Sequence, residues 1–462
     1  MPTKKNFYCD MKLNRIMVLN WLRLGLIVII LAHYFCHISH LFNFFETDMK
    51  PRAQNCFWFA RVGSAEGDCY IVDFLHFYSG GLLNKERIEK NLPLDVYNSF
   101  LLTQTIERVI APMRPIGTYC FQYPPMFFAL ITPLAYFDLY TAWRLWFFIL
   151  AICVVITYIV IAYDSLADRP LLLCGLFIFI TSFPVSENFF LGQTTPIEAV
   201  ILALSFRLLI KKNYFWSGLI AGASLLKLQH CLIILIPGFC VGKKDFLRGF
   251  LITLGVELLL AIIAVGFDNI WHFIRIIYVA EITHSIKDLD DIWYYFTFTG
   301  MLECLPWFIS SAAKIGQVVF VFICLIVLGA WLKIYPTLHK ISNQSMQLIA
   351  SITTIAFVTF NVHGCWYDYL LFIFPCFWLY IWSTTNESEY SGRQSIIRLI
   401  ISLIVFTLPF LFWDNLAMKA SENTITGYQL RYFLISMLLL SSGMIALLLE
   451  FKRYRNKPLL EK

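Results

Sequence analysis

The sequence predicts an all-α protein, a bundle of helices that crosses a lipid bilayer about twelve times. Hydrophobic residues make up 59% of the 462 residues and charged residues only 14%, whereas soluble domains contain about 45–50% and about 25%. Apolar runs recur along most of the chain. Because the backbone must satisfy its own hydrogen bonds in lipid, an apolar run of about 20 residues indicates a spanning helix. This composition excludes a soluble enzyme, a disordered chain and a nucleic-acid binder.

The first predicted element is a membrane anchor at residues 16–35. Three lysines and Arg15 precede this apolar run, and basic flanks stay in the cytoplasm, so we expect a cytoplasmic N-terminus. No small-residue cleavage site follows the run, which favours an anchor over a removable signal peptide. The polar stretch 36–123 is then the first extracytoplasmic loop. Its mixture of charged and apolar residues predicts short helices on the membrane surface.

The remaining spans are predicted within residues 124–450. Eleven apolar runs occur there, which gives twelve spans in total, with a range of 11 to 13. An even number of crossings returns the basic tail, 451–462, to the cytoplasm, in agreement with the positive-inside rule. We therefore expect residues 1–462 to form a single multi-pass membrane domain with both termini in the cytoplasm.

One basic cluster, at residues 207–212, disagrees with this count because it would lie outside the cell. The disagreement disappears if 170–185 or 124–138 is re-entrant and if 214–238 is a helical hairpin with Lys227 at its tip. Broken helices of this kind occur where they line a cavity. The topology of this part of the chain stays open.

Asp73 is the first candidate for chemistry. It stands in an aromatic segment that contains Phe74, Phe77 and Tyr78, near the predicted membrane surface. Burial among apolar groups disfavours a charged carboxylate and raises its pKa, which suits a general base. The alternative is an ordinary carboxylate at the start of a helix, or a solvated loop acid.

Gln193 and Lys227 are polar residues at predicted membrane depth. The amide of Gln193 both donates and accepts hydrogen bonds. A lysine inside an apolar run is costly and tends to face a cavity or a partner, where Lys227 would suit a phosphate as a point charge. The alternative is a lysine that extends its charge from the helix end to water. Tyr123-Pro124-Pro125 marks a loop-to-helix junction, because proline is tolerated in the first turn.

A late turn between two apolar runs carries His363, Trp366, Tyr367 and Asp368. The histidine suits a hydrogen bond to a phosphate or a sugar, and the two aromatic rings suit stacking on a sugar face. An interfacial aromatic belt would explain the rings without any ligand. It explains the histidine and the aspartate less well.

Two further patterns are weaker. The acidic run Asp288–Asp291 contains oxygen ligands for a metal ion, but a short acidic run in an external loop is usually only solvated. Cys56 and Cys69 lie in a polar loop, where a disulfide between them stays open. The other cysteines fall mostly inside apolar runs and are interpreted as small buried side chains.

Taken in order, these motifs resemble the family 87 membrane glycosyltransferases of C type, such as polyprenyl-phosphate-mannose-dependent mannosyltransferases. The early part of the resemblance consists of Asp73-Phe74, Tyr78, Gly80-Gly81, Tyr97 and Tyr123-Pro124-Pro125. The middle and late parts consist of Gly192-Gln193, Gly218, Gly222, Lys227, His363, Trp366, Tyr369 and Pro375. The resemblance covers roughly residues 65–380. The sequence departs from the family pattern at Thr194-Thr195, where Asn or an apolar residue is more usual.

The resemblance implies a metal-independent, inverting transfer from a polyprenyl-phosphate sugar to a lipid or glycan hydroxyl at the outer face of a bacterial inner membrane. Asp73 would be the base that deprotonates the hydroxyl. Lys227 and His363 would stabilise the departing phosphate. Substrate-binding roles would belong to Tyr78, Tyr123, Gln193, Trp366, Tyr367 and Asp368. No cofactor is implied.

Two other function classes stay open at this point. A transporter or lipid flippase is a polytopic protein too, but such proteins favour internal repeats, and none is found in this sequence. A lipid-linked glycan ligase or polymerase would use the same class of donor. It usually relies on outer-loop basic groups, for which Arg52, Arg61 and Arg114 are candidates.

Overall fold

The structure is a computed structural model. It describes residues 60–62, 68–71, 73–111, 114–115, 121, 123–162, 183–283, 298–303, 312–334, 342–360, 366–384, 394, 396–398, 400–401, 404–405 and 422–456. The chain divides into two compact units, Met1–Arg61 and Val62–Lys462. All helices described below belong to the second unit. The predicted first span, 16–35, lies outside the described residues.

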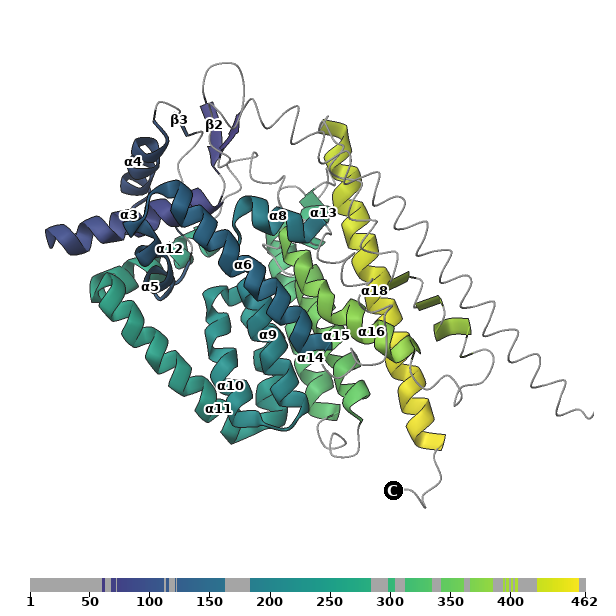
Figure 1. The fold of residues 1–462 in the computed structure, drawn as a ribbon. Helices are drawn as coiled ribbons and strands as arrows, with labels where there is room; N and C mark the ends of the chain where they lie inside the picture. The colour runs from purple at the N-terminus through teal and green to yellow at the C-terminus, as the bar shows by residue number, and fades with distance from the viewer. Residues whose placement is uncertain are drawn as a thin grey trace, which may run out of the picture. The chain divides into compact units, whose positions relative to one another are not determined.

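Helices form nearly all of the described structure, which confirms the all-α prediction (Figure 1). The α-helices are α3 Asp73–Lys90, α4 Ser99–Ile110, α5 Phe127–Ile131, α6 Leu139–Ala162, α8 Phe183–Leu191, α9 Thr195–Ile210, α10 Tyr214–Gly222, α11 Leu228–Val265, α12 Phe267–Thr283, α13 Phe298–Glu303, α14 Ala312–Ile334, α15 Asn343–Phe360, α16 Ile373–Thr384 and α18 Glu422–Asn456. Short 3₁₀ helices are η2 Thr132–Tyr136, η4 Ala223–Leu226 and η7 Trp366–Phe372. Three short strands are also present, β1 Ala60–Val62, β2 Asp68–Ile71 and β3 Arg114–Pro115, and β2 pairs with β3 in parallel.

Four helices in the described part of the chain are long and apolar enough to cross a membrane. They are Thr141–Ala162, Lys314–Lys333, Phe433–Lys452 and His230–Val265, the last of which contains a sharp change of direction at Lys243. Their exposed surfaces are rich in large aliphatic and aromatic side chains, which a soluble protein would bury. The membrane character predicted from composition is therefore confirmed.

Residues 124–138 do not form the predicted crossing helix. The chain makes one short α-helical segment, α5, followed by the 3₁₀ helix η2. Pro133 at the start of η2 has no backbone N–H to continue the α-helical pattern. Ten helical residues rise only about 15–20 Å, less than the roughly 30 Å of hydrocarbon. The prediction of a spanning helix at 124–138 is wrong.

A hairpin with Lys227 at its tip replaces the continuous apolar run 214–238. Helix α10 continues into η4, and the backbone of Lys227 is extended, with φ −135° and ψ 94°, before α11 begins. Within α11 the chain reverses at Lys243, whose φ is 44°, and the rings of Phe239 and Phe250 lie 5.8 Å apart. In a straight helix, residues eleven apart would be about 16 Å apart.

The start of the first arm of this hairpin, at Tyr214, lies close to the end of the second arm, at Gly242. A Cβ atom added to Gly242 would lie 3.1 Å from the Cβ atom of Tyr214. Lys211 and Lys212 lie three and two residues before Tyr214, and Lys243 and Lys244 directly follow Gly242. The two basic clusters therefore lie at the same end of the structure, which is the arrangement that removes the disagreement found in the sequence.

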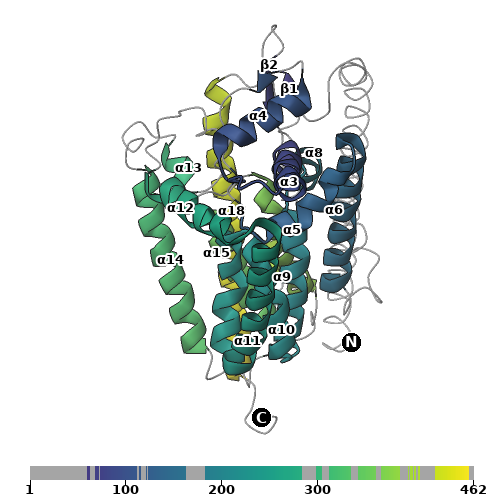
Figure 2. The same cartoon turned by 90° about the vertical axis from the view of Figure 1, so that its left-hand side faces the viewer.

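The polar stretch before the first Pro-Pro pair contains the two helices α3 and α4, as expected. Figures 1 and 2 show that α3 lies crosswise to α9 and α10, rather than alongside them. Its C-terminal half is attached to the end of α11, since Asn84 Nδ2 and Arg87 Nη2 donate to the Ala264 carbonyl oxygen at 3.0 and 2.6 Å. These bonds satisfy a carbonyl that the end of a helix leaves without a partner.

The hydrophobic core lies among α9, α11, α14, α15, α16, η7 and α18. Large side chains such as Trp331, Trp382 and Phe206 are almost fully buried there. A second group of aromatic rings lies beneath α3 and supports the site described next.

Candidate active site

Asp73 is the first residue of α3, and its carboxylate is partly buried. Burial raises the pKa of this carboxyl to about 6, because desolvation outweighs the hydrogen bond from Gln193 and the positive charge of Lys227, which both lower it. Asp73 is thus both a carboxylate at the start of a helix and a carboxylate of raised pKa, although the sequence by itself left these two descriptions as alternatives.

Aromatic side chains hold the start of α3 in place. Phe77 packs its ring against the rings of Tyr123 and Phe127, with centroids 4.8 and 5.0 Å apart. Trp146 of α6 lies 6.2 Å from Phe77 and donates a 2.7 Å hydrogen bond from Nε1 to the carbonyl oxygen of Gly192. The aromatic residues around Asp73 therefore fix both α3 and the loop that contains Gln193.

The loop between α8 and α9 passes very close to α3 at Gly192. The φ angle of Gly192 is +72°, and a Cβ atom there would lie 2.5 Å from the Cβ atom of Phe74. Only glycine tolerates both the backbone conformation and the close approach. The next residue, Gln193, is 1% exposed and receives a 3.1 Å hydrogen bond on Oε1 from the hydroxyl of Tyr123. Its amide nitrogen is thereby left to donate to Asp73.

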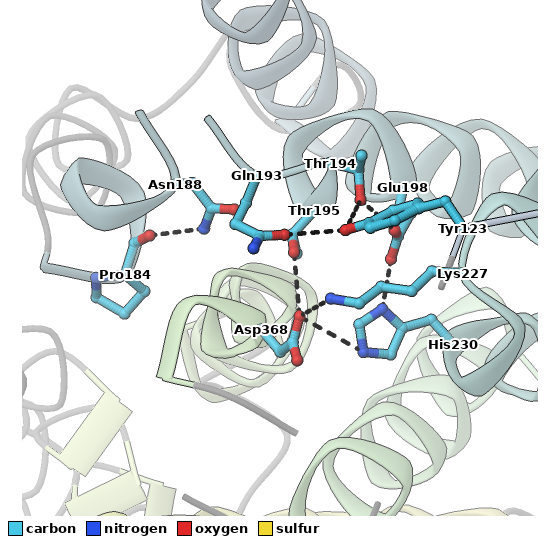
Figure 3. Close-up of polar contacts among 10 residues, drawn as sticks. All are labelled: Tyr123, Pro184, Asn188, Gln193, Thr194, Thr195, Glu198, Lys227, His230 and Asp368. Carbon is cyan, nitrogen blue, oxygen red and sulfur yellow. Dashed lines mark hydrogen bonds and ion pairs between the residues drawn. The ribbon is translucent and has the colours of Figure 1, made fainter. Parts of the chain in front are cut away.

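Lys227 and Asp368 form an ion pair next to the Gln193 loop (Figure 3). Lys227 Nζ lies 2.6 Å from Asp368 Oδ1, and the hydroxyl of Thr195 donates to the same oxygen at 3.0 Å. The side chain of Asp368 is 1% exposed and that of Lys227 13%. Both charges also act on the pKa of Asp73, Lys227 lowering it and Asp368 raising it. One polar cluster therefore contains all three groups.

Glu198 and His230 complete this polar cluster. Glu198 accepts a 3.0 Å hydrogen bond from Thr194 on Oε1, and its other oxygen contacts Nδ1 of His230. His230 Nε2 lies 3.7 Å from Asp368 Oδ1. Figure 3 shows Lys227 and His230, from neighbouring positions at the start of α11, both pointing toward Asp368.

The structure brings five of the predicted site residues together: Asp73, Tyr123, Gln193, Lys227 and Asp368. The hydroxyl of Tyr78, another predicted residue, donates to the carbonyl oxygen of Phe137 at 2.9 Å, and its role in substrate binding stays a prediction. His363 lies outside the described residues, and the side chains of Trp366 and Tyr367 are not described. The acidic run 288–291 and Cys56 also lie outside the described part.

Sequence reasoning missed Glu198, His230 and Thr195 as site residues. A signal was present for Glu198, because a carboxylate within the apolar run 194–210 is as costly as a lysine within an apolar run. His230 lies three residues after Lys227, in the first turn of α11, which begins directly after Lys227. In the part of the chain that the structure describes, no group of three or more His, Cys, Asp or Glu side chains is arranged to hold a metal ion.

Comparison with known proteins gives one family. The family model described as glycosyltransferase family 87 matches residues 121–360, which is just over half of the chain and contains the Gln193 loop and the Lys227 hairpin. A comparison with curated proteins gave no match. The matched region contains Tyr123, Gln193, Glu198, Lys227 and His230 of the polar cluster, whereas Asp73 and Asp368 lie outside it. The chain belongs to glycosyltransferase family 87 and is a membrane glycosyltransferase.

Proposed function

We propose that this protein transfers a sugar, mannose or another hexose or pentose, from a polyprenyl-phosphate donor to a hydroxyl of a lipid or glycan. The observation that carries the proposal is that the partly buried Lys227 lies close enough to Asp73, a carboxyl with a pKa of about 6, for its positive charge to act on that pKa. A base and a cation in one site are what a hydroxyl nucleophile and a phosphate leaving group require.

Asp73 acts as the general base in this proposal. It removes the proton of the acceptor hydroxyl as the hydroxyl oxygen attacks the anomeric carbon, and the configuration of that carbon inverts. A pKa of about 6 leaves most of the carboxylate ionised near pH 7 yet makes it a better proton acceptor than an ordinary aspartate. The hydrogen bond from Gln193 keeps the carboxylate oriented toward the site.

Lys227 stabilises the leaving group. When the bond between the anomeric carbon and the phosphate oxygen breaks, the electron pair stays on the phosphate, and its negative charge grows. Lys227 stands at the N-terminal end of α11, where the helix dipole adds to its positive charge. His363 remains a second predicted phosphate ligand, on the basis of the resemblance alone.

The membrane orientation follows from the basic clusters. Since residues 211–212 and 243–244 lie at one end of the hairpin, the positive-inside rule assigns that end to the cytoplasm. Lys227 at the hairpin tip, and the start of α3 with it, then lie toward the outer face. This orientation suits a bacterial inner membrane with an extracytoplasmic active site, about twelve spans and a basic cytoplasmic tail.

The experiment is a transfer assay with the full chain in lipid nanodiscs. The protein is incubated with polyprenyl-phosphate sugars and lipid or glycan acceptors, and release of polyprenyl phosphate is followed. Asp73→Asn should lower the rate by about 10²–10⁴-fold, the usual contribution of a general base. An Asp73→Asn protein with the rate of the unsubstituted protein would overturn the assignment of the base.

Thermal unfolding provides the control for Asp73→Asn. The folded protein binds a proton at Asp73 more tightly than the unfolded chain does, so ionisation of this carboxyl costs stability above about pH 4. Removing the charge should leave the unfolding temperature unchanged or raise it. Loss of transfer together with an intact fold separates a chemical role from a structural one.

A further inference from the structure

His230, three residues after Lys227, is bound through one of its two ring nitrogens. His230 is 1% exposed, and its Nδ1 atom contacts a carboxylate oxygen of Glu198. The other oxygen of Glu198 is occupied by the Thr194 hydroxyl at 3.0 Å. A carboxylate on Nδ1 fixes both the proton on that nitrogen and the orientation of the ring. The direction in which Nε2 points is therefore determined by Glu198.

The second ring nitrogen of His230 has no hydrogen-bond partner in the part of the chain that the structure describes. It lies 3.7 Å from Asp368 Oδ1, beyond hydrogen-bond distance. Leaving a buried polar atom without a partner destabilises the folded protein. Such an atom calls for an explanation, and a catalytic position whose missing partner comes from a bound group is one.

Three side chains converge on the oxygen that His230 faces. Asp368 Oδ1 has Lys227 Nζ at 2.6 Å, the Thr195 hydroxyl at 3.0 Å and His230 Nε2 at 3.7 Å. An anionic oxygen surrounded by donors from α9 and the start of α11 is the environment that a phosphate oxygen also requires. The Asp368 carboxylate therefore marks where the donors of the site point.

We propose that His230 is a catalytic residue that donates a hydrogen bond from Nε2 to the phosphate of the lipid donor, with Glu198 as the residue that positions it. This inference rests on the proposed function, because it assumes a phosphate leaving group. With protons on both nitrogens the ring carries a positive charge, which Glu198 balances. Lys227, directly before α11, and His230, in its first turn, then bind phosphate oxygens. The phosphate gains charge against these preorganised donors as the glycosidic bond breaks.

A purely structural pair between α9 and α11 is the competing explanation, and asparagine and glutamine distinguish the two. The amide nitrogen of Asn reaches the position of Nδ1, so His230→Asn keeps the bond to Glu198 and removes the donor at Nε2. The amide nitrogen of Gln reaches the position of Nε2, so His230→Gln does the opposite. A structural pair predicts that His230→Asn is the milder change, whereas a phosphate ligand predicts that His230→Gln is the milder one.

The experiment measures binding of a polyprenyl phosphate, and of the polyprenol without phosphate, to the full chain in nanodiscs. The readout is ligand-induced thermal stabilisation. His230→Asn should weaken binding of the phosphate about tenfold or more, the loss expected for one hydrogen bond to a charged group, and should leave binding of the polyprenol unchanged. His230→Gln should retain more phosphate affinity than His230→Asn. Glu198→Gln, which preserves shape, should weaken phosphate binding in the same direction and is the second variant if His230→Asn does not fold.

His272→Asn is the matched control. His272 of α12 also pairs with a carboxylate, since its Nδ1 lies 2.8 Å from Asp95 Oδ2. Among the described residues, no hydrogen bond or ion pair joins His272 or Asp95 to the polar cluster. Its phosphate affinity should equal that of the unsubstituted protein. The inference is overturned if His230→Asn binds polyprenyl phosphate normally, or if it loses polyprenol affinity equally.

The proposed function fails separately from this inference. A protein that prefers polyprenyl phosphate to polyprenol through His230, yet transfers no sugar, would contradict the proposed reaction and leave the phosphate site in place. A protein that transfers sugar but binds phosphate independently of His230 would contradict only the inference. No preference for the phosphate over the polyprenol would contradict both.

Discussion

Lys227 and Asp368, 141 residues apart in the sequence, form an ion pair of 2.6 Å in the interior of the helical unit. The pair connects the tip of the hairpin to η7. Removing one partner of a buried ion pair leaves the other charge buried without a counter-charge. This lowers the free energy of unfolding more than removing both charges does. This asymmetry makes the pair testable independently of catalysis.

We expect Lys227→Met to lower the free energy of unfolding by about 3–5 kcal/mol, because the Asp368 carboxylate is left buried without its cation. The double variant Lys227→Met, Asp368→Asn should recover most of that loss. Neither variant should transfer sugar at the normal rate, since the cation at the leaving group is absent from both. Unfolding in denaturant checks the stabilities, and a single variant as stable as the unsubstituted protein would contradict the role given to the pair.

Transfer should depend on pH through Asp73. The base must be ionised to accept a proton, and burial raises its pKa to about 6, so kcat/KM should fall as the pH is lowered through about 6. An ordinary aspartate would place this limb near pH 4. A pH–rate profile of the full chain checks the prediction, and an acid limb below about pH 5 would show that Asp73 is not the group observed.

Gly192→Ala should reduce both stability and activity. The added Cβ would lie 2.5 Å from the Cβ atom of Phe74, and the φ of +72° is unfavourable for alanine by about 1–2 kcal/mol. Any shift of Phe74 displaces Asp73 from Gln193, so transfer should fall as well. Gly255→Ala in α11 is the control: its Cβ would meet nothing within 4 Å, and it should stabilise the protein by about 0.5–1 kcal/mol. Comparable unfolding temperatures for the two variants would refute this account.

Tyr123→Phe should lower kcat with little change in unfolding temperature. The substitution removes the 3.1 Å hydrogen bond to Gln193 Oε1, and Gln193 is then free to turn its amide away from Asp73. We expect a loss of roughly tenfold, the value of one hydrogen bond of about 1.4 kcal/mol. Tyr158→Phe is the matched change, because the buried hydroxyl of Tyr158 has no hydrogen-bond partner among the described residues. If both variants retain full activity, Gln193 does not depend on Tyr123.

The sequence predicted those features that depend on local composition and on the cost of burying charge. An apolar majority in helix-length runs indicated a membrane helical protein without any knowledge of tertiary contacts. Asp73 and Lys227 stood out because a charged group in apolar surroundings is expensive and is retained for a purpose. The same rule, applied to Glu198, would have added it to the candidates.

Only the tertiary structure decided which of these groups meet. Asp368 contacts Thr195 from 173 residues away, and His230 contacts Glu198 from 32 residues away. Helical periodicity tells which face of a helix is apolar, but it contains no information on which other helix that face will contact. The crossing predicted at 124–138 failed for a related reason, since hydropathy measures apolar content and not the length of helix that a proline permits. The sequence alone thus determined the membrane and the unusual charges within it, and packing decided that these charges form one site.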